Sequence, residues 1–475
     1  MAAPPPCPRP LAGRLAGKSL PVQVAMLVAW PLAQQFLLWL SGAVDMAIAG
    51  HISGTASAAL AVGTQTTWLM ALLVMGAASG AAALVARATG KGHKSLARAA
   101  LGQGMALTLA VALALGLFVA GLAEVLTHLA GLRDETLPLC VAFLRITALA
   151  LPLLAVMFGG SAAMTASGDP RPTFFAMAAM NAVNLTASLL LALPAGTVIG
   201  PEHWHVTLPW GLGMGVRGIA LGSILGWATG AAVILGRLMF ARGHHLRLIG
   251  HRLLPHWHTM RRIFAVSWPA MLERLGQGGG HWAILAVVGA VAHQAGAHPQ
   301  AVHGVISRIE GLSYLPALAF GIAAATLTGQ YLGANDPAQA RRAARTCWLL
   351  GAGLMSCVGL LFLAIPGTLV RCMTNQPEIL EAAPPILRIC GLYQFFFGTA
   401  NILQGAMRGA GDTRANALLF NLLAWGVRLP LAALLGIGLG WGLTGIWIAI
   451  ACETTLRGLV FMWRFAGGQW AHVKV

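Results

Sequence analysis

Long apolar stretches separated by short polar segments dominate the chain. Each stretch is about 20 residues long, the length that an α-helix needs to cross the hydrocarbon core of a bilayer. The stretches are continuous and lack the strict alternation of membrane β-strands, so helices are predicted. The pattern predicts twelve spans, at residues 22–48, 58–84, 101–123, 138–159, 173–195, 214–236, 264–291, 302–328, 347–369, 384–405, 416–436 and 443–463.

The composition supports this interpretation. Of the 475 residues, 57% are hydrophobic and 9% are charged, and the mean hydropathy is +0.75. Soluble domains carry about 25% charged residues. A soluble globule of this length would need far more polar surface, so we predict an all-α integral membrane protein.

The net charge of +17 raises the question of nucleic-acid binding, but the placement of the charges argues against it. Lys and Arg cluster in alternate loops, and the loops between them hold only Arg133 and Arg371. By the positive-inside rule, both termini are predicted in the cytoplasm of a multi-pass protein of the inner (plasma) membrane. The largest basic segment, residues 237–262, is predicted to be a cytoplasmic linker close to anionic lipid headgroups.

Motifs for enzymatic chemistry are absent from the sequence. The seven cysteines are scattered without a CxxC pair, which favours neither a disulfide framework nor a zinc site. The chain contains no HExxH, no GxSxG and no Walker sequence. We therefore predict a protein that is not an enzyme, needs no cofactor or metal, and is not driven directly by ATP.

The two halves of the chain repeat each other. Gly333 follows Gly90 by 243 residues within similar segments, and Gly411-Asp412 follows Gly168-Asp169 by the same 243 residues. Each half therefore contributes six spans in the same orientation, an arrangement typical of transporters whose substrate site lies between the halves. The predicted division is an N-terminal six-helix bundle at 1–236, the linker at 237–262 and a C-terminal bundle at 263–475.

Three carboxylates inside predicted spans, Asp45, Glu273 and Glu310, are the candidates for coupling transport to an ion. A charged side chain at the bilayer centre costs about 2.5–3.5 kcal/mol on insertion scales, so such residues face a cavity or a partner. A desolvated carboxyl group can take up a proton at physiological pH. The structural alternative is ion pairing with intramembrane arginines, at Arg145, Arg388 or Arg428.

A fourth carboxylate, Glu453, has Arg457 four residues later on the same helix face. This spacing favours a structural ion pair over a coupling site.

Polar and aromatic residues within the spans are candidates for lining a substrate cavity. They are Gln34, Asn181, Asn184, Tyr393 and Gln394. The alternative for each one is a hydrogen bond between neighbouring helices.

Several of these segments together resemble the multidrug and toxic compound extrusion (MATE) transporters over nearly the whole chain. The resemblance rests on Pro31, Val44-Asp45 and Gly50; on Ala83–Arg87 and Gly90; on Gly168-Asp169 and Arg408–Arg414; and on Pro269–Glu273, His303, Ile309–Ser313 and Gly329–Ala334. It implies two pseudo-symmetric six-helix bundles that form a V-shaped cleft, and secondary antiport of drugs, organic cations or other small amphiphiles against H⁺ or Na⁺. It also implies that Asp45 is a coupling residue and that Glu273 belongs to a cation site of the NorM-like branch.

The sequence departs from both branches of the family. Phe397 stands where the NorM-like branch has a tenth-helix aspartate, and Asn181 and Asn184 lie in the segment where the DinF-like branch has another. We therefore expect proton coupling through Asp45, assisted by Glu273 and Glu310. The predicted function is a monomeric exporter of small cationic or aromatic compounds by alternating access. The alternative is a flippase for a lipid-linked precursor, which the intramembrane arginines keep open.

Overall fold

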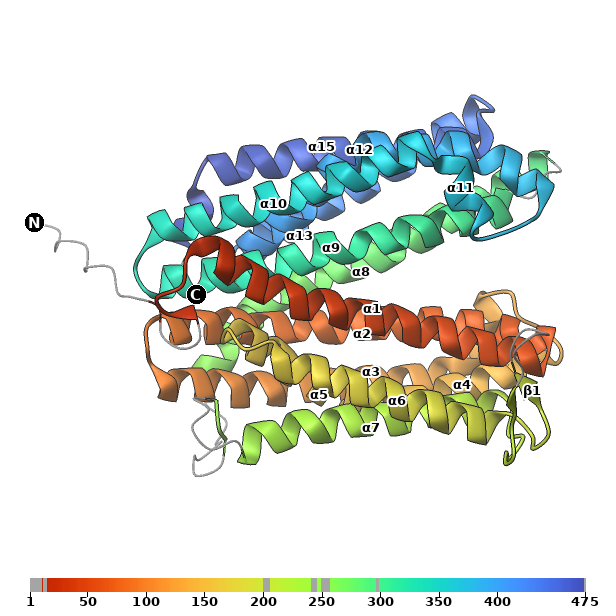
Figure 1. Ribbon diagram of the computed structural model, residues 1–475, viewed down its shortest axis with the longest axis horizontal. Helices are drawn as coiled ribbons and strands as arrows, with labels where there is room; N and C mark the ends of the chain where they lie inside the picture. Colours follow the sequence, from red (N-terminus) through yellow and green to blue (C-terminus); the bar gives the residue numbers. More distant parts are fainter. Residues whose placement is uncertain are drawn as a thin grey trace, which may run out of the picture.

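The protein is an assembly of long helices arranged in two groups (Figure 1). The computed structural model describes residues 11, 15–199, 206–240, 246–248, 257–295 and 299–473. The first group consists of α1 (Leu20–Ile52), α2 (Gly54–Gly90), α3 (Lys94–Leu129), α4 (Thr136–Leu149), α5 (Leu151–Ala166), α6 (Arg171–Ala192) and α7 (Val216–Phe240), with a two-stranded antiparallel pair, β1 (Val198–Ile199) and β2 (Val206–Thr207), between α6 and α7.

The second group repeats this arrangement with more irregular helices. It consists of α8 (Trp257–Ala295), α9 (Pro299–Gly333), α10 (Pro337–Ala364), the short α11 (Pro366–Arg371), α12 (Pro377–Ala410), α13 (Thr413–Leu423), α14 (Leu429–Ala433) and α15 (Gly442–Ala466). Two π-helical turns, η2 (Ala424–Arg428) and η3 (Leu434–Gly438), flank α14, and a 3₁₀ turn, η4 (Gln469–His472), follows α15.

The predicted twelve spans agree with the helices that the structure describes. Eleven of these are long and apolar enough to cross a membrane, and the pair α4 and α5, bent by 49°, makes the twelfth. Pro152 lies in the first turn of α5, and proline removes a backbone N–H from the helix ladder, which accounts for a break here. The ninth predicted span, 347–369, is corrected in one respect, because α10 ends at Ala364 and α11 begins a new helix at Pro366.

The internal repeat reappears in the backbone. Gly90 ends α2 and Gly333 ends α9. Gly168, after α5, has φ +90°, and Gly411, after α12, has φ +86°. These two glycines occupy the left-handed region that only glycine adopts without strain, so each stops one helix before the next begins. The predicted boundaries at 236 and 263 stay a prediction, because much of the linker lies outside the described residues.

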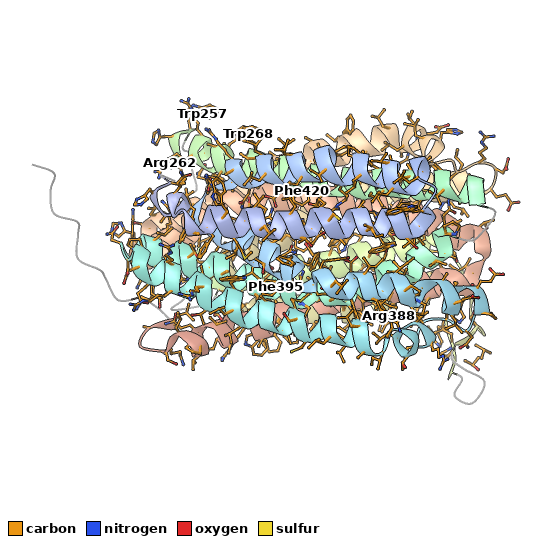
Figure 2. All side chains as sticks on the ribbon, turned by 90° about the horizontal axis from the view of Figure 1, so that it is seen from above. Trp257, Arg262, Trp268, Arg388, Phe395 and Phe420 are labelled. Atoms are coloured by element: carbon orange, nitrogen blue, oxygen red, sulfur yellow. The ribbon has the colours of Figure 1, made fainter. Side chains whose placement is uncertain are left out.

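Lipid-facing and internal surfaces differ in the expected way. Leu113, Leu117 and Phe118 on α3 and Leu418 on α13 are exposed large hydrophobic residues. Figure 2 shows side chains covering the outside of the bundle, with Trp257 and Arg262 toward one end and Arg388 toward the other. Large exposed apolar side chains along the outer helices are typical of a surface that lies against lipid tails.

The two groups of helices contact each other mainly through α2, which packs against α8 and α9, and through α1, which packs against α9. We call the end of the molecule where α2 and α9 end the basic end, because basic residues gather there, in the loop after α2 and in the first turns of α3 and α10. These residues are Lys91, Lys94, Arg341 and Arg342. In Figure 1, α1 begins and α15 ends on this side, at the left of the view.

Candidate functional site

Asp45 lies in a polar cluster inside the first half. Its side chain is buried on α1, and Ser223 Oγ on α7 donates to its Oδ2 over 3.5 Å. Asn184 on α6 donates to Ser223 Oγ over 3.3 Å and accepts a hydrogen bond from Ser41 Oγ over 3.3 Å. Within the described residues, Asp45 Oδ1 is buried without a hydrogen-bond partner. One carboxylate oxygen is therefore held by a short chain of neutral donors while the other has unused acceptor capacity.

Close packing of α6 and α7 makes this cluster possible. A Cβ atom on Gly222 would lie 2.2 Å from Ser188 Oγ, and one on Gly226 would lie 2.9 Å from Asn184 Cβ. Small residues four apart let two helix backbones approach closely. The glycines of α7 thus bring Ser223 within reach of both Asn184 and Asp45.

Glu273 lies in a second polar cluster, in the other half. Its Oε1 is 3.4 Å from Arg408 Nη1 on α12 and accepts a hydrogen bond from Gln404 Nε2 over 3.1 Å. The Glu273 side chain is 4% exposed and that of Arg408 is 16% exposed. Glu273 Oε2 is buried, and no hydrogen bond to it is present among the described residues. This carboxylate is therefore partly neutralised, with one oxygen atom still open to a proton or a cation.

Glu310 lies in a separate environment on α9. The hydroxyl group of Tyr393 on α12 donates to its Oε1. Ser313, one turn farther along α9, donates to Gln394 Oε1 over 3.4 Å. The structure thus brings Glu310 together with Tyr393, and it brings Gln394 next to the same helix face, while Glu273 has different partners.

The three intramembrane arginines that could pair with these carboxylates lie in different environments. Arg145 and Arg388 are exposed. Arg428 Nε donates to Glu453 Oε2 over 3.0 Å, and Arg457 Nε lies 3.3 Å from Glu453 Oε1. The predicted Glu453–Arg457 pair is present, with Arg428 as an additional partner. The structural alternative, an ion pair with Arg145, Arg388 or Arg428, does not hold for Glu273, whose partner is Arg408.

A cavity of about 210 Å³ lies between the two halves. Its wall is formed by α1, α2, α5 and α6 on one side and by α8, α9 and α12 on the other. Gln34 lines this cavity. The other predicted cavity residues are not among its described lining residues: Asn184 belongs to the Asp45 cluster, Asn181 donates to Met177 O of its own helix, and Tyr393 and Gln394 lie beside Glu310. Their contact with a substrate stays a prediction.

Between the cavity and the basic end, the two halves are in direct contact. Arg87 Nη2 on α2 donates to Ala410 O over 2.7 Å, and Gln330 Nε2 on α9 donates to Ala166 O over 2.8 Å. A Cβ atom on Gly90 would lie 1.9 Å from Gln330 O. Only glycine at this position allows the two backbones to approach so closely, so the end of α2 and the end of α9 form a tight seal.

A family model described as MatE matches residues 31–197 and 269–434, one segment in each half of the chain. The chain belongs to the MatE family. Membership confirms the resemblance, and the presence of one matched segment in each half agrees with the internal repeat. As a MatE protein the chain is a membrane transporter and not an enzyme.

Curated relatives and solved structures agree with this assignment. A probable multidrug resistance protein NorM of Thermotoga maritima is 26% identical over 440 residues, which cover 92% of this chain and 90% of the relative. A protein of the same name from Xanthomonas axonopodis pv. citri is 25% identical over 429 residues, covering 90% of this chain and 89% of the relative. An outward-facing multidrug resistance MATE family transporter of the MOP superfamily superimposes with a TM-score of 0.85 at 16% identity, covering 96% of this chain and 98% of that one. At this identity the likeness shows the MATE fold.

Three residues of the Asp45 and Glu273 clusters were not predicted from the sequence. Ser223 bridges Asp45 and Asn184, Arg408 pairs with Glu273, and Gln404 donates to the same carboxylate. Arg408 lies three residues beyond the predicted span 384–405, whereas α12 continues to Ala410 and so includes it. A glycine every fourth residue on α7, from Gly218 to Gly230, was the available signal for the contact that positions Ser223.

Proposed function

We propose that this MatE protein is a secondary active exporter of small molecules that uses the cavity between its halves for the substrate and an H⁺ or Na⁺ gradient as its energy source. The observation that carries the proposal is the arrangement of one central cavity with a buried carboxylate in each half, Asp45 on one side and Glu273 on the other. The relatives named as probable multidrug resistance proteins support a broad range of drug-like substrates.

Asp45 is the proposed coupling residue of the first half. In the charged form it accepts a hydrogen bond from Ser223, and its free oxygen has no other partner within the described residues. Protonation of Asp45 removes a buried negative charge and adds an O–H donor. The hydrogen bonds that join α1, α6 and α7 in this cluster must then rearrange. One proton moving inward down 150 mV yields about 3.4 kcal/mol, an amount sufficient to bias a two-state helix arrangement.

Glu273 and Glu310 are proposed to assist in the second half. Glu273 pairs with Arg408 and accepts a hydrogen bond from Gln404, and Glu310 accepts one from Tyr393. Among the described residues, no group of three or more His, Cys, Asp or Glu side chains is placed to hold a metal ion, which supports H⁺ over Na⁺ as the coupling ion.

The proposed orientation places the basic end and both termini in the cytoplasm of the plasma membrane. The seal formed by Gly90, Gln330 and Arg87 then closes the cavity from the cytoplasm. Alternating access requires that this seal opens to admit the substrate and re-forms before release. We propose that a single chain suffices, because the cavity and both carboxylates lie within it.

The test is export of aromatic dyes from cells that lack their own drug exporters. Expression of the chain is expected to lower the steady-state dye content relative to cells with an empty vector, and a protonophore is expected to abolish the difference. Replacing the pH gradient with a Na⁺ gradient identifies the coupling ion. Equal dye content with and without the protein, across dyes of both charges and in both gradients, contradicts the proposal.

A further inference from the structure

The charged residues in the wall of the central cavity are of one sign. Of the described lining residues, only Arg274 on α8 and Arg408 on α12 carry a formal charge. Neither Asp45, nor Glu273, nor Glu310 lines the cavity. A substrate in this space therefore meets guanidinium groups and no carboxylate.

The two arginines differ in how they are neutralised. Arg408 pairs with Glu273, which lies behind the cavity wall. Arg274 Nη1 donates to the neutral Gln277 Oε1 over 3.1 Å, and Gln277 in turn donates to Tyr314 over 3.5 Å. Among the described residues, no ion pair joins Arg274 to a carboxylate. Within the described part of the chain, the wall thus keeps one positive charge that no paired carboxylate balances.

An unbalanced guanidinium group in the interior of a membrane protein is unfavourable unless an anion accompanies it. Guanidinium presents several N–H donors in a planar fork, which fits carboxylate, sulfonate or phosphate oxygens better than any other ligand. The same charge repels a cation that enters the cavity, and low dielectric strengthens both effects. The electrostatics of the wall therefore favour an anionic ligand.

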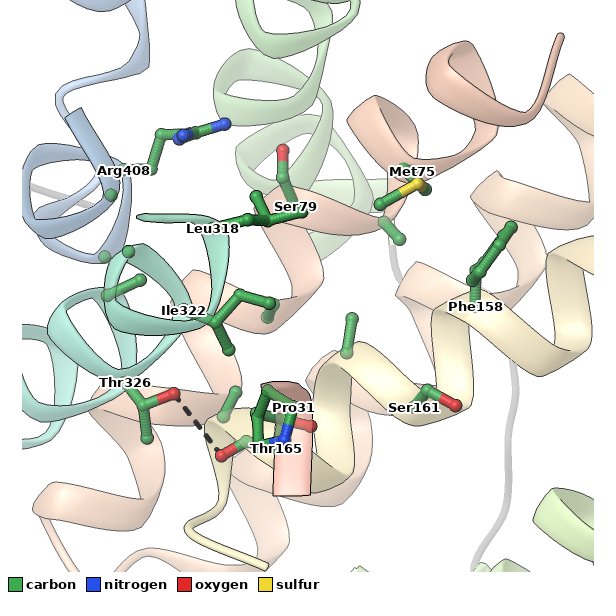
Figure 3. A pocket seen from close by; sticks show the side chains of 18 of the residues that line it. Pro31, Met75, Ser79, Phe158, Ser161, Thr165, Leu318, Ile322, Thr326 and Arg408 are labelled. Carbon is green, nitrogen blue, oxygen red and sulfur yellow. Dashed lines mark hydrogen bonds between the residues drawn. The ribbon is translucent and has the colours of Figure 1, made fainter. Parts of the chain in front are cut away.

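The rest of the cavity wall is mostly apolar. The part of the ligand that does not contact the arginines is therefore expected to be apolar. Figure 3 shows Arg408 on one side of the cavity and Met75 and Phe158 across it, with the hydroxyl groups of Ser161 and Thr165 nearby. Leu318 and Ile322 add aliphatic surface. A molecule with an acidic head and an apolar or aromatic body matches this distribution.

We propose that the cavity binds a small organic anion, whose acidic group is held by Arg274 and faces Arg408 while its apolar body contacts Met75 and Phe158. This inference rests on the proposed function in one respect, that the cavity is the transport site. It differs in the sign of the charge from the cationic compounds among the substrates predicted from the sequence, and it agrees with an aromatic body.

Binding and transport are measured separately to test the inference. Fluorescence anisotropy of carboxyfluorescein, an aromatic anion, and of ethidium, an aromatic cation, is recorded against the purified full-length chain in lipid nanodiscs. The wild-type protein is expected to bind carboxyfluorescein more tightly than ethidium. Arg274→Gln is expected to weaken carboxyfluorescein binding about tenfold or more, since hydrogen bonds to charged groups are strong. Arg274→Lys keeps the charge and is expected to retain more of the binding than Arg274→Gln.

The matched control is Arg261→Gln, which removes an exposed arginine of the same helix outside the cavity. It is expected to leave carboxyfluorescein binding unchanged. Tighter binding of ethidium, or equal carboxyfluorescein binding by the wild type and Arg274→Gln, overturns the anion site. Displacement of carboxyfluorescein by a soluble aryl phosphate supports a soluble anion, and displacement only by a polyprenyl phosphate supports an anionic lipid-linked ligand at the same arginine.

Transport of the two dyes into proteoliposomes under an imposed pH or Na⁺ gradient distinguishes the two proposals. Binding of carboxyfluorescein without gradient-driven movement of either dye supports the anion site and contradicts the exporter. Gradient-driven movement of ethidium without binding of carboxyfluorescein supports the exporter and overturns the anion site.

Discussion

Glu273 on α8 and Arg408 on α12 form an ion pair within the helical assembly, with Oε1 and Nη1 3.4 Å apart. Gln404 donates a hydrogen bond to the same oxygen atom, so Oε1 of Glu273 has two polar partners. Glu273 is not among the described lining residues of the cavity, whereas its partner Arg408 is one of them. Stability and ligand selectivity are therefore linked at this contact.

The Glu273–Arg408 pair is expected to show energetic coupling. Arg408→Gln leaves a buried carboxylate without its cation, which costs about 3 kcal/mol for a buried pair. Adding Glu273→Gln removes the uncompensated charge and is expected to recover part of the loss. The measurement is the Tm of the purified single and double variants in detergent. Arg345→Gln, at an exposed position on α10, is the control, and additive Tm shifts in the double variant would contradict coupling.

Asp45→Asn is expected to lower gradient-driven transport at least about tenfold, as for an intramembrane carboxylate on an ion pathway. Asparagine keeps the size of the side chain and can still bond Ser223, but it cannot exchange a proton. Dye transport by proteoliposomes under an imposed pH gradient measures the effect. Asp134→Asn makes the same chemical change at an exposed residue whose φ of +50° asparagine tolerates. Full transport by Asp45→Asn would remove this residue from the mechanism.

Glu453→Gln is expected to destabilise the protein without a specific effect on coupling. The carboxylate of Glu453 is completely buried and lies between Arg428 and Arg457. Its loss leaves two guanidinium groups without a counter-charge, at a cost of about 3–5 kcal/mol. The monodisperse fraction that survives heating, measured by size-exclusion chromatography, should fall relative to Glu381→Gln, which changes an exposed glutamate. An unchanged thermal profile would show that this triad is not structural.

Gly90→Ala is expected to hold the basic end open. The added Cβ would lie 1.9 Å from Gln330 O, and backbone atoms cannot yield as a flexible side chain does. Spin labels at His93 and Asn335, in a variant without native cysteines, report the separation of α2 and α9 at this end. The distance distribution should shift to longer values. Gly42→Ala on α1, where a Cβ meets nothing within 4 Å, is the control, and a distribution for Gly90→Ala equal to that of the parent would refute the seal.

The length and spacing of the apolar stretches were enough to predict the number of membrane spans and the internal repeat from the sequence alone. Span number depends on local hydropathy, and the repeat on a fixed separation between Gly90 and Gly333, so neither requires knowledge of tertiary contacts. The carboxylates Asp45, Glu273 and Glu310 could also be identified from the sequence, because each is an acidic residue within a long apolar stretch.

Tertiary structure alone decided what surrounds each carboxylate. Glu273 and Gln404 are separated by 131 residues, and Asp45 and Ser223 by 178, so their pairing depends on which faces of distant helices meet. The same holds for the cavity, whose wall includes Arg408 and not Glu273 among the described lining residues. Periodicity places a residue on a helix face, but it does not say which helix packs against that face, and the charge of the cavity wall follows from that packing.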